Sequence, residues 1–150
     1  MRNLFRQNQQ TVSPTFYLSL LEFLLQAKHS IVAIGDELGL TSLQAITLLL
    51  VDERRPRPMK NFCMLYHCDA SNITGIVDGL EQKGMVSRRS DPKDRRIKTI
   101  RLEPAGRQMQ QCIIEKLETS NGLLLDSLSA SEAKQLVQII DKLAATKKPV

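Results

Sequence analysis

The sequence predicts a mainly α-helical protein that carries one short β-hairpin. Apolar residues recur at helical spacing through most of the 150-residue chain, which is the pattern of amphipathic helices. The exception is residues 85–102, where the runs MVSRRS and RIKTIRL flank the turn-forming tetrapeptide DPKD. A chain of this length buries roughly 68–70% of its unfolded surface. We therefore expect one domain over residues 1–150, with no need for a stabilising disulfide or metal.

The first expected helix covers about residues 13–36. Ser13 is a favoured N-cap, and Pro14 suits the first helical position. The run TFYLSLLEFLLQAKHSIVAI is apolar on most sides, so we expect broad burial, in part against a second subunit. The chain has no run of 18 apolar residues and no apolar signal-like start, so we expect no membrane partner. Residues 1–12 and the TKKPV end are expected to be disordered.

Two shorter helices are expected next. Thr41 and Gln44 form the pattern of a capping box, which opens a helix that runs to about Val51. Pro56 and Pro58 break the chain after it. The segment MKNFCMLYHC then favours a short third helix.

A fourth helix is expected after Asp69, which is placed to cap it. Its apolar positions are spaced 0, 3, 4 and 7 and so form one buried stripe, namely Ile73, Ile76, Val77 and Leu80. The first turn and the opposite face carry small or polar residues, namely Ser71, Asn72, Thr74, Gly75 and Asp78. Gly84 is placed to end this segment in a left-handed conformation.

Two more helices are expected after the hairpin. Glu103-Pro104 begins a long one, and Ser129-x-x-Glu132 is a capping box before the last. The last helix has an apolar stripe that includes Leu136, Ile140 and Leu143. This stripe and the first helix have no partner within a small domain, so we expect them to pair across a two-fold axis in a homodimer.

Positive charge is concentrated in one stretch. Residues 83–101 hold eight lysines and arginines against two aspartates, which is more positive charge than the chain's net +5. A second basic run, RRPRPMK, lies at residues 54–60. Focused positive charge favours a polyanionic partner, although a charge run is also what a solvated surface shows.

The order helix, short helix, helix, hairpin is that of a winged helix-turn-helix. A fourth helix with an apolar back and a small, polar front suits the major groove of double-stranded DNA, where its N-terminal side chains reach base edges. A basic hairpin beside it suits the DNA backbone, with an arginine in the minor groove. Charge, helix face and hairpin together predict binding to double-stranded DNA.

The segment LEQKGMVSRRSDPKDRRIKTIRLEPAG resembles the MarR (multiple antibiotic resistance regulator) family. LT at 40–41 with Gln44, and SNITGIVDGLE at 71–81, extend the resemblance over about residues 38–106. It implies a cytoplasmic, homodimeric transcription factor, more often a repressor, that binds a pseudo-palindromic operator. It also implies dimerisation helices at about 13–36 and 104–146 around a winged lobe at about 41–102. A small-molecule effector is expected to bind between the dimerisation helices and this lobe.

The resemblance also implies roles for particular residues. Arg95 matches the arginine of the wing tip that enters the minor groove, and Asp94 matches the carboxylate that positions it. Ser71, Asn72 and Thr74 match the groove-facing residues of the recognition helix. The full expected set of DNA-contacting residues is Ser71, Asn72, Thr74, Gly75, Arg88, Arg89, Lys93, Asp94, Arg95, Arg96 and Lys98.

Four positions depart from the family pattern. Gly75 and Gly79 stand where members often carry basic residues, and each glycine lowers helix propensity by about 1 kcal/mol. Pro58 and Glu103 stand where Thr or Ser usually caps a helix. The specificity for DNA sequence is therefore expected to depend more on contacts from the wing.

The three cysteines form no C-x-x-C pair, which is typical of a reducing cytoplasm. Cys63, Cys68 and Cys112 occupy small or apolar helix positions, so we expect buried thiols, with oxidant sensing left open. His29 and His67 share no metal-ligand spacing, so we expect no metal and no cofactor. The aromatic residues are expected in the core, although they could line an effector pocket. They are Phe16, Tyr17, Phe23, Phe62 and Tyr66.

No catalytic constellation is present: the sequence lacks a Ser/His/Asp set, a Gly-rich phosphate loop and a carboxylate pair with a partner. We therefore expect no enzyme. Two alternatives to DNA binding stay open. A winged helix used for protein–protein contact would not need so basic a wing, and an RNA-binding one would need exposed aromatic residues, of which residues 85–102 have none.

Overall fold

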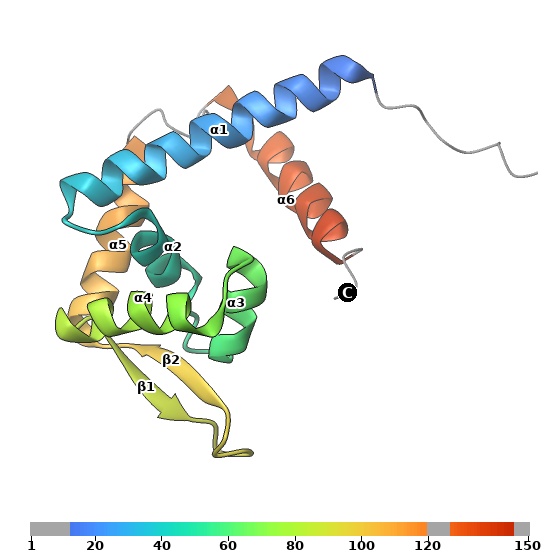
Figure 1. Ribbon diagram of the computed structural model, residues 1–150. Helices are drawn as coiled ribbons and strands as arrows, with labels where there is room; N and C mark the ends of the chain where they lie inside the picture. The colour runs from blue at the N-terminus through green and yellow to red at the C-terminus, as the bar shows by residue number, and fades with distance from the viewer. Residues whose placement is uncertain (1–12, 120–126, 146–150) are drawn as a thin grey trace, which may run out of the picture.

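The computed structural model describes residues 13–119 and 127–145, and the mainly helical fold with one hairpin is confirmed (Figure 1). The expected disordered ends, residues 1–12 and 146–150, lie outside the described residues. The elements in order are α1 (Pro14–Glu37), α2 (Ser42–Leu50), α3 (Met59–Tyr66), α4 (Ala70–Gln82), β1 (Val86–Ser90), β2 (Lys98–Leu102), α5 (Pro104–Thr119) and α6 (Ala130–Ala145).

The helix starts expected from capping residues are confirmed. The Thr41 hydroxyl accepts from the Gln44 backbone N–H at 3.2 Å, and the Gln44 side chain accepts from the Thr41 N–H at 3.1 Å. At α4, an Asp69 carboxylate oxygen accepts from the Asn72 N–H at 2.9 Å. Each contact satisfies a backbone donor that the first helical turn leaves without a partner. Pro58, the residue before α3, provides no such side-chain bond.

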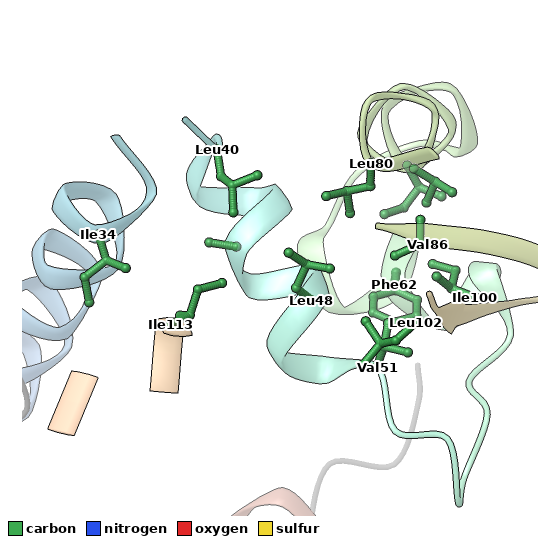
Figure 2. Packing of buried hydrophobic residues seen from close by; sticks show 13 residues of the cluster. Ile34, Leu40, Leu48, Val51, Phe62, Leu80, Val86, Ile100, Leu102 and Ile113 are labelled. Atoms are coloured by element: carbon green, nitrogen blue, oxygen red, sulfur yellow. The ribbon is translucent and has the colours of Figure 1, made fainter. Parts of the chain in front are cut away.

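The core lies between α2, α4 and the hairpin, and reaches α1 and α5 at its edge (Figure 2). The expected stripe of α4 supplies Ile73, Val77 and Leu80, which are buried, while Ile76 is partly buried. The remaining core residues are Ile34, Leu40, Ala45, Leu48, Val51, Phe62, Val86, Ile100, Leu102 and Ile113. Because α4 buries this side, its small and polar side is left on the surface.

The hairpin is antiparallel, with Val86 opposite Leu102 and Ser90 opposite Lys98. Gly84 has a φ of +65°, so the chain turns from α4 into β1 through the left-handed conformation that glycine adopts without strain. On its other edge, β2 meets the loop before α3 through an isolated bridge between Pro58 and Thr99. The wing is therefore attached to the lobe on both sides.

Helix α1 lies across one end of the molecule, and most of it is exposed within this chain (Figure 1). Only Ile34 and Gly35 are buried in it, where its C-terminal end packs against α2 and α5. By length and composition α1 is apolar enough to cross a membrane: an 18-residue window has a mean hydropathy of 1.2, with 11% of it buried. The sequence led us to expect no helix that spans a membrane, and passing this test does not contradict that expectation, because an apolar helix of a soluble protein passes it too.

The aromatic residues divide between core and surface. Phe62 is 1% exposed and lies in the core, as expected. The Tyr66 hydroxyl shares a 2.9 Å hydrogen bond with the Thr47 hydroxyl. Phe16 and Tyr17 are 50% and 61% exposed, so the core assignment was wrong for these two within a single chain. They lie in the first turn of α1, beyond the reach of the core.

Candidate nucleic-acid interface

The N-terminal half of α4 presents the expected polar face. Ser71, Asn72, Thr74 and Gly75 are all exposed. The Ser71 hydroxyl donates to Asp69 at 2.7 Å, and the Thr74 hydroxyl donates to the Ala70 carbonyl at 2.8 Å. Both hydroxyls therefore present acceptor lone pairs outward. Within the described chain the Asn72 amide has no side-chain bond, so it can donate and accept at once, as adenine recognition requires.

Asp69 is the residue that fixes this first turn. Its carboxylate accepts from the Asn72 N–H and the Ser71 hydroxyl, and these hydrogen bonds hold the pKa of Asp69 below its ordinary value. A carboxylate at a helix N-terminus is also favoured by the helix dipole. The charged form of Asp69 therefore orders the turn that carries Asn72.

Arg88 connects β1 to α4 rather than pointing into solvent. One guanidinium nitrogen lies 2.5 Å from Asp78, and the other lies 2.6 Å from Glu81. The backbone N–H of Arg88 also donates to Glu81 at 2.8 Å, and its guanidinium donates to the Thr74 carbonyl at 3.2 Å. Arg88 was expected among the DNA contacts; the structure places it in an intramolecular clamp instead of on an open face.

Two other expected residues also have partners. Arg89 is 62% exposed and lies 3.8 Å from Glu103, a separation at which an exposed ion pair holds a side chain weakly. The Lys98 amino group donates to the Ser90 hydroxyl at 2.8 Å across the hairpin. Neither contact removes the positive charge from the wing.

The wing tip is shaped by two aspartates. Asp91 accepts from the Lys93 N–H at 2.8 Å, and Asp94 accepts from the Arg96 N–H at 3.0 Å. The described residues show no ion pair between Asp94 and Arg95, so the implied carboxylate–guanidinium contact is absent from this state. Asp94 instead stabilises the turn that contains Arg95, through its hydrogen bond with the Arg96 N–H.

At the wing tip, the exposed residues Lys93, Arg95 and Arg96 form no ion pair within residues 13–119 and 127–145. The turn between β1 and β2, which carries them, lies at the end of the hairpin away from the helices (Figure 1). The described structure thus separates an inner part of the basic stretch, Arg88 and Arg89, which pair with the protein's own carboxylates, from the tip cations, which do not.

Sequence reasoning missed the partners of the inner part. Asp78 and Glu81 stand three residues apart on α4, so they share one helix face, and Arg88 follows in the next strand. This spacing of two carboxylates could have indicated a partner for the Arg88 side chain. Arg107 was also missed: it donates to Glu53 at 2.6 Å and to the Leu102 carbonyl at 2.9 Å, and so joins α5 to the loop after α2.

The arrangement of α2, α3, α4 and the hairpin defines a winged helix-turn-helix protein. The family model "MarR family" matches residues 40–98, which is the part that forms this lobe. This lobe is similar to the winged helix-turn-helix lobe of MarR family transcriptional regulators. The chain is 33% identical over 75 residues to the HTH-type transcriptional regulator YdgJ of Bacillus subtilis (strain 168). That match covers 50% of this chain and 46% of the relative, so the chain spans about half the length of this curated relative.

Solved structures extend the likeness to the flanking helices. A MarR family regulator from Silicibacter pomeroyi has a TM-score of 0.74 at 18% identity, over 91% of this chain and 92% of that one. CouR from Rhodococcus jostii RHA1, solved with p-coumaroyl-CoA bound, has a TM-score of 0.73 at 20% identity, over 95% of this chain and 100% of that one. At these identities the likeness shows the fold alone.

Proposed function

We propose that this protein is a cytoplasmic, sequence-specific regulator that binds double-stranded DNA as a homodimer and represses transcription until an effector binds. The single observation that carries the proposal is the pairing of an exposed, polar first turn of α4 with a wing tip whose cations lack ion pairs in the described chain. Such a pair of surfaces suits a major groove and the flanking backbone or minor groove.

Roles within the interface follow from the contacts of each residue. Asn72 reads a base edge, because its amide is exposed and has both donor and acceptor groups. Arg95 enters the minor groove, and Lys93 and Arg96 neutralise phosphates. Asp94 shapes the turn under Arg95 through the Arg96 N–H. Arg88 positions the wing against α4, and Gly75 leaves room for close approach of the DNA.

Dimerisation is supported by where the exposed apolar residues lie. Of the fourteen exposed large hydrophobic residues in the described chain, eleven are on α1 and α6. Helix α6 has no buried residue, and Figure 1 shows it apart from α4 and the hairpin. Burying apolar area stabilises association by about 25 cal/mol per Å². Pairing these helices with a second copy would place two α4 helices on one pseudo-palindromic operator.

An effector is supported by the relative CouR, which was solved with p-coumaroyl-CoA bound and covers 95% of this chain. In the proposed mechanism a small molecule bound between the dimer base and the lobe favours one spacing of the two α4 helices. A ligand shifts this equilibrium only by its difference in affinity for the two spacings.

The test is a mobility-shift titration with DNA from the region upstream of the protein's own coding sequence. A scrambled duplex and single-stranded RNA of the same sequence serve as competitors. We expect a specific complex whose affinity exceeds that for the scrambled duplex by on the order of 10³ or more. Equal affinity for both duplexes, or tighter binding to the RNA, would contradict the proposal.

A further inference from the structure

The C-terminal end of α3 carries two cysteines at the first and sixth positions of the turn that ends the helix. His67 has a φ of +50°, so the helix ends through a left-handed residue. The Cys63 carbonyl accepts from the His67 N–H and also, at 3.1 Å, from the Cys68 N–H. This six-to-one bond is the mark of a Schellman motif, which is frequently accompanied by a contact between the side chains of the first and sixth residues.

Where this contact forms it is usually between apolar residues; here the residues at both positions are cysteine. Each is partly buried and packs against the core, so neither is the fully buried thiol that the sequence predicted. The Cys63 thiol also donates to the Met59 carbonyl at 3.7 Å, which holds its side chain along the helix. Cys112, the third cysteine, stands on α5 and has no such partner.

We infer that Cys63 and Cys68 form a two-thiol site that a trivalent arsenical bridges. With phenylarsine oxide, the arsenic forms one bond to each sulfur. The two thiol protons leave with the reagent's oxygen as one water molecule, and the arsenic stays trivalent. The reaction needs no oxidant or reductant. Because the turn already holds both residues, the second bond forms within one complex at high effective concentration.

A soft, thiophilic reagent suits this pair better than a peroxide. Partial burial raises the pKa of Cys68, and the neighbouring Cys63 thiol and Asp69 carboxylate raise it further. Less thiolate at neutral pH slows attack on a peroxide. A bridged arsenical is favoured by two bonds to soft sulfur, so its stability depends on the spacing of the thiols more than on their ionisation.

The experiment uses the full, reduced chain and does not depend on DNA binding, so it fails independently of the proposed function. The protein is incubated with one equivalent of phenylarsine oxide and an excess of a monothiol competitor. Intact mass and the remaining alkylatable thiols are then measured. We expect one arsenical per chain, and a fall from the three thiols of the sequence to one.

Variants that each lack one of the three cysteines locate the site. Cys112→Ser should retain the arsenical as wild type does, whereas Cys63→Ser and Cys68→Ser should hold it on the order of 10² more weakly. Cys63→Ala and Cys68→Ala repeat the test without a new hydroxyl, and circular dichroism checks that each variant is folded. Retention by a folded Cys63 or Cys68 variant, or loss in Cys112→Ser, would overturn the inference.

Discussion

Arg88 shows how one residue can belong to a basic stretch and yet serve the protein's own fold. Its guanidinium joins Asp78 and Glu81 of α4, while its backbone N–H donates to the same Glu81. The side chains of Arg88 and Glu81 are only 28% and 30% exposed, so solvent screens this pair less than a surface pair. The angle between wing and recognition helix therefore depends on Arg88.

We predict that Arg88→Ala lowers the free energy of unfolding by about 1–2 kcal/mol, since it leaves two carboxylates without their cation. Arg89→Ala is the matched control. Its side chain is 62% exposed with one long ion pair, so its loss should cost less than about 0.5 kcal/mol. Urea unfolding followed by circular dichroism measures both. Equal effects of the two substitutions would contradict the clamp.

Asp69 links the order of the recognition helix to pH. Its pKa is held below the ordinary value by two hydrogen bonds, so its contribution to stability is fully present above the unfolded-state pKa of about 3.9. That contribution is lost as the pH falls through the lowered folded-state pKa. Asp69→Ala should therefore lower the unfolding temperature at pH 7, with a deficit that shrinks on acidification toward pH 3.

Thr41→Ala is the control for this pH dependence, because the Thr41 hydroxyl caps α2 without titrating. Its deficit of about 1 kcal/mol should stay constant over the same pH range. Thermal unfolding of both variants at several pH values compares them. A deficit for Asp69→Ala that does not change with pH would show that the carboxylate charge plays no part in the cap.

Asn72 and Lys93 should differ in what their loss does to DNA binding. Asn72→Ala should cost about 1–3 kcal/mol on the preferred operator and much less on random DNA, because it removes a contact to a base edge. Lys93→Ala should weaken binding to all sequences alike and reduce the salt slope by about one unit. Titrations at several salt concentrations separate the two, and a uniform loss in Asn72→Ala would remove it from the major groove.

At the scale of elements, three of the four glycines in the described helices differ in what surrounds them. A Cβ at Gly75 would meet nothing within 4 Å, whereas one at Gly79 would lie 2.5 Å from the Gln44 amide nitrogen. A Cβ at Gly106 would lie 1.9 Å from the Met85 carbonyl oxygen. Gly79 thus allows α4 to approach α2, and Gly106 allows α5 to approach the start of the wing.

The same substitution should therefore have three different outcomes. Gly75→Ala should raise the free energy of unfolding by up to about 1 kcal/mol, the gain in helix propensity. Gly79→Ala should gain less, because the Gln44 side chain must move. Gly106→Ala should be strongly destabilising, because backbone must move. Chemical unfolding of the three variants gives the order, and a stabilised Gly106→Ala would contradict the close approach.

Local patterns predicted most of these elements, because caps and turns depend on neighbours in sequence. Thr41, Asp69 and Gly84 are all placed as expected. What the sequence did not reveal depends on how elements pack. The Arg88 clamp needs the docking of β1 on α4, and the Asp94 contact to the Arg96 N–H needs the shape of the turn.

At the scale of the whole molecule, the burial of apolar residues differs between the lobe and the two terminal helices. The lobe has a closed core, whereas α1 and α6 expose most of theirs. We predict that light scattering at micromolar concentration, without detergent, gives about twice the 16.9 kDa chain mass. Substitution of Leu21 and Leu25 together by Lys should yield monomer, because burial of a charge in an apolar interface is costly.

The control for this prediction is Leu65→Lys on α3. Leu65 is 51% exposed, close to the 53% and 57% of Leu21 and Leu25, but it lies on the lobe. This variant should remain dimeric. A wild-type monomer, or a protein that needs detergent to stay in solution, would contradict the proposed pairing of α1.

The side chains of α5 give this helix a mechanical role. Gln110 donates to the Leu48 and Val51 carbonyls at the end of α2, at 2.6 Å and 3.2 Å, and Lys116 reaches Glu37 of α1 at 2.5 Å. These contacts join α5 to the lobe at one place and to α1 at another. At 1.5 Å per residue the sixteen residues of α5 form a lever arm of about 24 Å. A tilt of about 10° at one end of that arm displaces the other by about 4 Å, enough to move a recognition helix out of register with a groove that repeats every 34 Å or so.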